Sequence, residues 1–133
     1  MFHSKGLTKI CDLPSHMVKV NFWDNNLIKI ENLPKNLRIF YCSQNYITKI
    51  ENLPPELVTF HCYSNLITKI ENLPFHLKRF KYDGNVIIKI ENLPHSIIRF
   101  EHDNLPETSQ KEKIAKKIIT LKSIVHNYLI NNL

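Results

Sequence analysis

The sequence Lys29-Ile30-Glu31-Asn32-Leu33-Pro34 occurs four times, because the same six residues return at 49–54, 69–74 and 89–94. A less regular copy, Lys9-Ile10-Cys11-Asp12-Leu13-Pro14, stands 20 residues before the first. Each copy begins 20 residues after the one before it. A fixed period of this length is typical of arrays in which every repeat forms one structural unit and stacks on its neighbours. The period therefore predicts the fold class before any other feature is considered.

Each repeat carries an apolar pair two residues apart, such as Phe40 and Cys42. Alternation with a period of two indicates a strand with one buried face. The pattern predicts a short strand at 39–43, with Phe40 and Cys42 inside and Tyr41 outside. Repeats of equal length stack in register, so each strand should pair in parallel with the strand of the next repeat. We expect an aromatic stack along the inner face, formed by Phe40, Phe60, Phe80 and Phe100.

An asparagine follows each predicted strand at a fixed distance. A buried side-chain amide at this place can hydrogen-bond backbone groups of its own repeat and of the next one, where the turning chain has lost its partners. We therefore predict a structural ladder rather than a ligand site. Its members are Asn25, Asn45, Asn65 and Asn85.

The segment that returns from one strand to the next is short and contains a proline, Pro34 in the first regular repeat. Proline fixes φ and removes a donor, and it forces the residue before it into an extended conformation. Too few residues remain for a long helix. We expect extended or polyproline-II segments on the convex side, with at most a single 3₁₀ turn.

The chain resembles leucine-rich-repeat proteins in the pattern Leu37-x-x-Phe40-x-Cys42-x-x-Asn45-x-Ile47-x-x-Ile50. The short period with Leu33-Pro34 resembles the LPX subclass of secreted bacterial effectors. The richness in isoleucine, asparagine and lysine also resembles repeat proteins of giant DNA viruses of amoebae. The resemblance implies a curved solenoid with a parallel sheet on its concave face, used for protein recognition. Unlike the effectors, this chain has no ligase domain in its sequence.

Two parts are predicted along the chain. Residues 1–106 form the solenoid, with a half repeat at 1–12 that we expect to cap the open end poorly. Regular repeats then begin at Leu13, Leu33, Leu53, Leu73 and Leu93.

Residues 107–133 form the second part, where the repeat pattern gives way to helical spacing. Ser109 to Glu112 has the form of a capping box, and apolar residues follow at 4-3-4-3 spacing. We predict an amphipathic helix of about twenty residues, ending near Asn131, that covers the last repeat. The alternative is a dimer formed through this helix, because its spacing also fits a short coiled coil.

Composition excludes several classes of protein. The 133 residues have room for one domain, and the net charge of +6 is carried largely by the tail. The 3 cysteines are odd in number and lack CxxC spacing, which argues against a disulfide framework or zinc site. We find no signal-peptide pattern and no apolar run that could span a bilayer. We expect an intracellular protein, in the host cytoplasm if the source is a virus, with no membrane association.

Cys42 and Cys62 fall at the same inward position of adjacent repeats. We predict that they are core residues, close enough to oxidise to a disulfide. No motif for a nucleophile, a phosphate loop or a metal site stands in a convincing context. We therefore predict a non-enzymatic protein with no catalytic residues, no cofactor and no metal.

The outward strand positions vary most between repeats, and they supply the candidate binding residues. Aromatic side chains occupy the early repeats and charged ones the later repeats, and exposed aromatic residues and arginine are enriched at protein interfaces. The predicted partner-binding residues are Trp23, Tyr41, His61, Tyr63, Arg79, Lys81 and Arg99. By contrast, the columns that begin with Lys29 and Glu31 are interpreted as a solvated face of weak ion pairs.

These residues favour a module that binds a protein or peptide on the concave sheet face. An alternative, ranked behind it, is a nucleic-acid-associated protein that uses Arg79, Lys81, Arg99 and the basic C-terminal helix. A third is a structural, self-assembling protein, because an open terminal repeat exposes a strand edge. The chain is expected to be a monomer, or a homodimer formed through an open end or the C-terminal helix.

Overall fold

The computed structural model describes residues 2–100 and 130–131, with Arg99 and Phe100 described as backbone only. The chain divides into two units, Met1–Glu101 and His102–Leu133. The second unit is described only at Ile130 and Asn131, which are helical. The rest of the predicted C-terminal helix therefore lies outside the described residues. The fold and the site below belong to the first unit.

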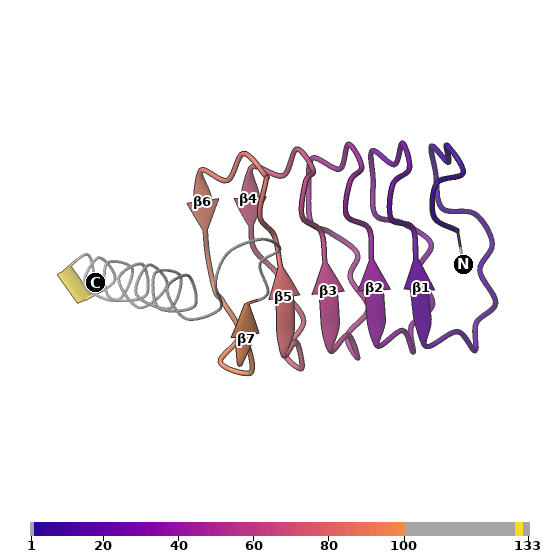
Figure 1. Ribbon diagram of the computed structural model, residues 1–133. Helices are drawn as coiled ribbons and strands as arrows, with labels where there is room; N and C mark the ends of the chain where they lie inside the picture. Colours follow the sequence, from indigo (N-terminus) through magenta and orange to yellow (C-terminus); the bar gives the residue numbers. More distant parts are fainter. Residues whose placement is uncertain (1, 101–129, 132–133) are drawn as a thin grey trace. The chain divides into compact units, whose positions relative to one another are not determined.

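One parallel sheet runs through the first unit and contains one strand from each regular repeat (Figure 1). Its strands lie in the order of the chain: β1 (Lys19–Asn21), β2 (Ile39–Tyr41), β3 (Thr59–His61), β5 (Arg79–Lys81) and β7 (Arg99–Phe100). Val20 pairs with Phe40, Phe40 with Phe60 and Phe60 with Phe80, so the register shift is one repeat. The prediction of short parallel strands is confirmed. The predicted strand at 39–43 ends earlier, because the chain turns through a left-handed residue at Gln44.

A second, two-stranded sheet lies on the return segments and was not predicted. It consists of β4 (Lys69–Ile70) and β6 (Lys89–Ile90), which pair in parallel with Ile70 beside Ile90. Proline argued for polyproline-II structure here, but the Lys-Ile dipeptide precedes the proline by several residues and is free to form ladder hydrogen bonds. The predicted 3₁₀ turn is absent from the described residues. Instead, the carbonyl oxygen of Pro34 accepts a bond of 3.1 Å from the Leu37 N–H, which closes a β-turn.

Left-handed backbone conformations mark two places in each of the first four regular repeats. Asn32 and its counterparts have φ near 50°, in a region that asparagine tolerates better than most residues. The residue before each ladder asparagine is also left-handed, and in the fourth repeat it is Gly84, with φ of 62°. The first row comprises Asn32, Asn52, Asn72 and Asn92, with φ of 54°, 56°, 54° and 48°. The repeated asparagine of the Glu-Asn-Leu-Pro sequence is thus explained by its backbone conformation.

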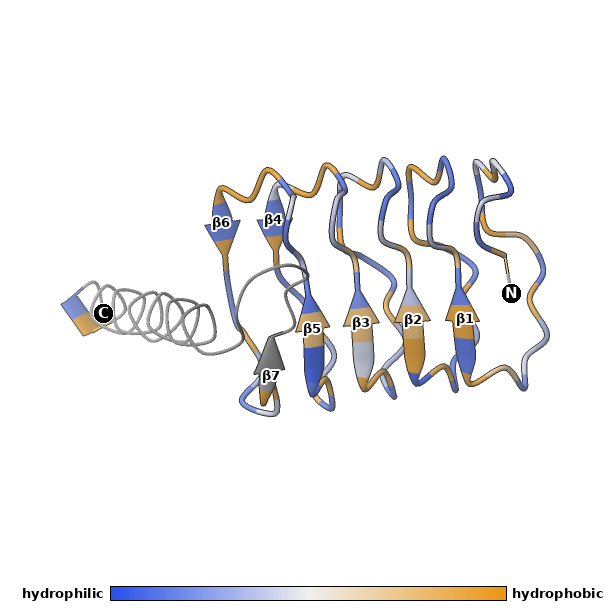
Figure 2. Cartoon of the chain, viewed as in Figure 1, coloured by the Kyte–Doolittle hydropathy of each residue, from blue (hydrophilic) through white to orange (hydrophobic). Residues whose placement is uncertain are grey.

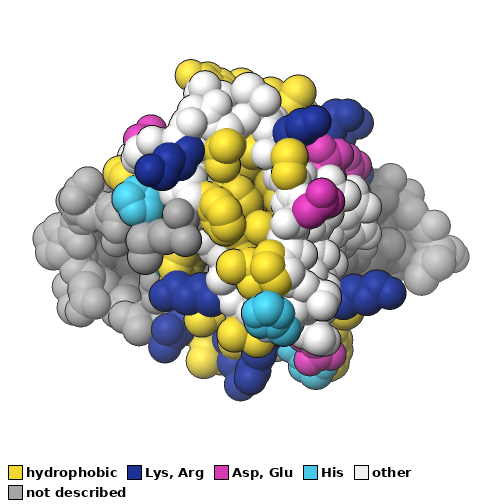
Figure 3. Space-filling model, turned by 90° about the vertical axis from the view of Figure 1, so that its right-hand side faces the viewer, with side chains coloured by type: hydrophobic (Ala, Val, Ile, Leu, Met, Phe, Trp, Pro, Cys, Tyr) yellow, Lys and Arg dark blue, Asp and Glu magenta, His cyan; other side chains and the backbone are white. Residues whose placement is uncertain are grey.

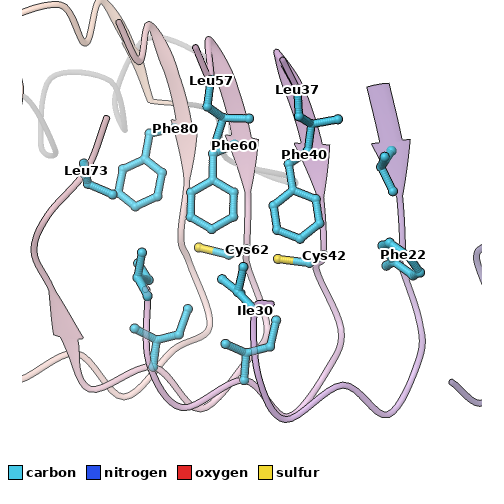
Figure 4. Close-up of a cluster of buried hydrophobic side chains, with 14 of the residues drawn as sticks. Phe22, Ile30, Leu37, Phe40, Cys42, Leu57, Phe60, Cys62, Leu73 and Phe80 are labelled. Atoms are coloured by element: carbon cyan, nitrogen blue, oxygen red, sulfur yellow. The ribbon is translucent and has the colours of Figure 1, made fainter. Parts of the chain in front are cut away.

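Hydrophilic and hydrophobic residues alternate along each repeat (Figure 2), and the hydrophobic ones face one continuous core. Phenylalanine rings stack along it: Phe40 and Phe60 have centroids 5.6 Å apart, and Phe60 and Phe80 5.7 Å apart. Cys42 and Cys62 lie beside these rings (Figure 4). The predicted aromatic stack is therefore present in the described side chains. The side chain of Phe100 lies outside them.

The N-terminal half repeat covers the first strand more completely than predicted. The N–H of Phe2 donates to the Asn21 carbonyl at 3.0 Å, and the Phe2 ring stacks on Phe22 at 5.0 Å. Ile10 is fully enclosed. Phe2 and Leu7 remain partly exposed, and hydrophobic side chains occupy the centre of this end of the molecule (Figure 3). The half repeat closes the core but leaves an apolar end face.

In the part of the chain that the structure describes, no helix has the length and apolar character needed to cross a membrane.

Candidate binding surface

A shallow hollow of about 210 Å³ lies on the face of the sheet opposite the phenylalanine stack. Its lining contains all four aromatic residues that the sequence assigned to partner binding: Trp23, Tyr41, His61 and Tyr63. They come together because successive repeats place equivalent positions on neighbouring strands. Asn21 and Ser43 complete the lining. We call this feature the aromatic hollow.

The rings of the hollow are packed against one another and against the N-terminal segment. Tyr41 and His61 have centroids 4.8 Å apart at an interplanar angle of 32°. Trp23 contacts His3, with centroids 6.4 Å apart. His3 was missed in the sequence, although it stands one full period before Trp23 and so belongs to the same column. The half repeat thus extends the aromatic surface by one residue.

Ser43 lies between Trp23 and Tyr63 and is only 1% exposed. Its hydroxyl is buried and has no hydrogen-bond partner among the described residues. A buried hydroxyl without a partner costs about 1–3 kcal/mol. The sequence indicated only that a small residue leaves space here. In the structure, the hollow has an unsatisfied polar group at its base.

Lysine side chains lie over two of the tyrosine rings. Lys19 Nζ is 5.6 Å from the centroid of Tyr41, and Lys81 Nζ is 4.4 Å from that of Tyr63. Such cation–π contacts hold the cation and its alkyl chain against the ring. Lys81 is accordingly buried, with 5% exposure, which corrects the expectation that it projects from the surface.

The predicted basic end of the surface is smaller than expected. Arg79 is exposed at the start of β5, whereas Lys81 is packed against Tyr63. The side chain of Arg99 lies outside the described residues. Of the three basic residues predicted to meet a partner, Arg79 alone is shown exposed in the described part. The aromatic residues therefore dominate the surface that the structure brings together.

The asparagine column lies behind the hollow, at the turn after each strand. Asn45 Oδ1 accepts from the Leu27 N–H at 2.8 Å, while Nδ2 donates to the carbonyls of Phe22 and Cys42, both at 3.0 Å. Leu27 and Phe22 belong to the preceding repeat, so the amide reaches backward and not to the next repeat as expected. The same arrangement holds Asn25, Asn65 and Asn85. These bonds fix the turn that carries Trp23, Ser43 and Tyr63.

The two core cysteines, Cys42 and Cys62, are buried and unreactive. Burial raises the pKa of the Cys42 thiol, and the neighbouring Cys62 raises it further. Burial likewise raises the pKa of Cys62, with a smaller contribution from Asp83. Both side chains therefore remain protonated thiols, which are poor nucleophiles and poor metal ligands. Among the described residues, no three His, Cys, Asp or Glu side chains converge in a way that could hold a metal ion.

Lysine and glutamate columns on the return segments form ion pairs with each other. Lys69 Nζ lies 2.6 Å from Glu71 and 3.0 Å from Glu91, and Lys89 Nζ lies 2.6 Å from Glu91. Hydrogen bonds from Lys89 and Lys69 lower the pKa of Glu91, and hydrogen bonds to Glu71 and Glu91 raise that of Lys69. These groups are open to solvent, so they add little to stability. The charges of Lys69, Glu71, Lys89 and Glu91 are thus compensated within the chain.

No protein-family model and no curated protein matches this chain. The case for a function therefore depends on the geometry described above.

Proposed function

We propose that the chain is a leucine-rich-repeat solenoid that binds a protein or peptide through the aromatic hollow on its five-stranded sheet. The observation that supports this proposal is the gathering of Trp23, Tyr41, His61 and Tyr63 around one depression. Their rings lie opposite the core, so they gain little from folding. Buried against a partner, such anchors each contribute about 2 kcal/mol or more.

The size of the hollow favours a macromolecular partner over a small substrate. Pockets for small molecules are usually about 300–1,000 Å³ and enclose most of the ligand. The hollow measures about 210 Å³ and is shallow, which suits one or two side chains of a bound segment.

Single-stranded nucleic acid is the second candidate, because aromatic rings beside cations are typical of such sites. The contacts of Lys19 with Tyr41 and of Lys81 with Tyr63 support it. It ranks second because the basic residues are few at the surface: Lys81 is buried, and Arg79 lies outside the lining of the hollow.

Peptide display tests the first candidate directly. Random peptides would be selected on the native chain and counter-selected on a Trp23→Ala, Tyr63→Ala double variant. We expect enriched peptides that bind the native chain and lose about tenfold or more in affinity on the variant, because two anchors are removed. Trp23 is the single tryptophan of the chain, so its fluorescence reports on occupancy of the hollow.

The controls separate the candidates. The variant should keep the circular dichroism of the native chain and unfold in one cooperative transition, because neither side chain belongs to the core, although loss of the contact between Lys81 and Tyr63 should lower its melting temperature slightly. Binding of a single-stranded oligonucleotide that weakens steeply with salt would favour the nucleic-acid candidate instead. Enriched peptides that bind both proteins equally would place the recognition surface outside the hollow.

A further inference from the structure

A second surface runs along the edge of the sheet where the strands begin. The five residues that immediately precede β1, β2, β3, β5 and β7 form a row: Val18, Arg38, Val58, Lys78 and Ile98. Backbone hydrogen bonds link each member to the next: the N–H of Arg38 donates to the Val18 carbonyl at 2.9 Å, and Val58 to Arg38 at 2.8 Å. Lys78 and Ile98 continue the chain of bonds at 2.9 and 3.0 Å. Apolar and cationic side chains therefore alternate in fixed register.

This row lines a groove of about 420 Å³, which we call the edge groove, together with Arg79. The aliphatic members at the two ends of the row are open to solvent, with Val18 55% and Ile98 79% exposed, and Val58 between them is half-buried. Exposed β-branched side chains in a row gain nothing for the core. The edge groove lies at the opposite ends of the strands from the aromatic hollow, and the two linings share no residue.

No described residue compensates the positive charge of the edge groove. Arg38, Lys78 and Arg79 are exposed and form no ion pair within the described chain. No carboxylate belongs to the described residues that line the groove. This differs from the return segments, where Lys69 and Lys89 are neutralised by Glu71 and Glu91 at 2.6–3.0 Å. A ligand that supplied carboxylates would complete the same kind of pairing here.

We propose that the edge groove binds an acidic amphipathic helix of a partner protein. Parallel strands are spaced about 4.8 Å apart, so the row presents an apolar side chain and a cation at alternate steps of that length. Successive turns of an α-helix are about 5.4 Å apart, which is close enough to match over the length of the groove. A helix laid across the strand ends would place aliphatic residues on Val18, Val58 and Ile98, and glutamates beside Arg38 and Lys78. The lining contains no aromatic ring, so it offers no platform for stacked bases.

The test uses a fluorescently labelled peptide of about 15 residues, the length at which a helix becomes stable in water. In this peptide, called the Glu peptide, Leu and Glu occupy alternate turns along one face of the helix. A second peptide, the Lys peptide, carries Lys in place of each Glu. Anisotropy should show that the native chain binds the Glu peptide and not the Lys peptide. Arg38→Glu with Lys78→Glu should weaken binding by about tenfold or more, because two attractive contacts become repulsive.

Lys9→Glu with Lys35→Glu is the matched control. Both residues are exposed, neither lines the edge groove, and the pair changes the net charge of the chain by the same amount. At about 0.15 M salt this control should keep affinity within about twofold, because distant charges are screened. Equal weakening by both variants would mean attraction to net charge alone and would overturn the proposal. So would equal binding of the two peptides, or no binding of the Glu peptide.

Two further measurements sharpen the outcome. If vesicles containing phosphatidylserine or an oligonucleotide bind in an Arg38- and Lys78-dependent way and the peptide does not, the occupant is not a helix and the proposal fails. The Trp23→Ala, Tyr63→Ala variant should bind the Glu peptide as the native chain does. Loss of binding in that variant would assign the peptide to the aromatic hollow and overturn the proposal.

Should the Arg38→Glu, Lys78→Glu variant fail to fold, Arg38→Gln with Lys78→Gln removes the same attraction without introducing repulsion.

Discussion

Asparagine performs two different tasks in each repeat, and the two are separable by substitution. The ladder asparagine is buried, and the side chain of Asn65 bonds four backbone groups. The asparagine before Leu-Pro is exposed and adopts a left-handed backbone. The first task depends on the amide group. The second depends on tolerance of positive φ, with an added side-chain bond from Asn32 to the Ile10 carbonyl and from Asn52 to the Ile30 carbonyl. Asn72 shows no such bond within the described chain, so it separates the two tasks.

Asn65→Ala should lower the free energy of unfolding by about 2–3 kcal/mol, because the Ile47 N–H and the carbonyls of Cys42 and Cys62 lose a partner. Chemical denaturation monitored by circular dichroism measures the loss. Asn36→Ala, at an exposed turn position, is the control and should change stability by less than about 0.5 kcal/mol. A native-like midpoint for Asn65→Ala would refute the importance of the ladder.

Asn72 has φ of 54° and makes no side-chain hydrogen bond within the described chain. Asn72→Ala should cost about 1 kcal/mol, because an L-residue with a Cβ resists the left-handed region. Asn72→Gly should be close to neutral, because glycine adopts this region freely. Thermal unfolding of the two variants decides the matter. If the Asn72→Ala and Asn72→Gly variants had the same melting temperature, the left-handed backbone would not explain why asparagine stands at this position.

At the scale of the elements, the core face of the sheet is chemically protected by its own packing. Cys42 and Cys62 follow β2 and β3 and have no exposed surface, whereas Cys11 is exposed. Iodoacetamide should therefore modify Cys11 alone in the folded chain and all three cysteines in urea, as mass spectrometry would show. Modification of Cys42 or Cys62 at the rate of Cys11 under native conditions would contradict the burial.

The raised thiol pKa values also give stability a pH dependence. An unfolded cysteine releases its proton above about pH 8.5, while the folded chain keeps both core thiols protonated. The unfolded state then binds fewer protons than the native state, so stability should fall as the pH rises above that value. Urea denaturation at neutral pH and at about pH 10 measures the change. The Cys42→Ala, Cys62→Ala variant should lose this part of the pH dependence.

The strands were predictable from sequence because period and alternation are local, repeated signals. Phe40 and Cys42 define an inner face, and the 20-residue period defines parallel register. The pairing of β4 with β6 was not predictable, because two residues of Lys-Ile carry no distinct signal. The burial of Lys81 was not predicted from the sequence for a different reason. It depends on Tyr63, which lies in a different column of the preceding repeat. The aromatic hollow was predictable as a cluster, but not its depth or the unsatisfied hydroxyl of Ser43.

At the scale of the described unit, the N-terminal half repeat acts as the first layer of the stack. Phe2 covers Phe22, and backbone groups of residues 2–7 meet the side chain of Asn25. Deleting residues 1–10 should therefore lower the melting temperature by several degrees and expose Phe22 to self-association. His3→Ala is the control for loss of a surface contact. Melting with light scattering tests this, and a truncated chain that stays monomeric and equally stable would show that the half repeat is dispensable.

The backward reach of each ladder asparagine has a consequence for the gene. The bonds that Asn45, Asn65 and Asn85 make to another repeat all go to the repeat directly before, at constant separations of 18 and 23 residues. Adding or removing 20 codons in phase therefore keeps these separations, so each surviving ladder asparagine finds the same backbone partners. Unequal recombination between the near-identical Lys-Ile-Glu-Asn-Leu-Pro copies produces such changes in phase automatically, because the matching copies align one period apart. Copy number can then vary among descendants with the stacking of the repeats preserved, and each added copy lengthens the sheet by one strand and the edge row by one residue.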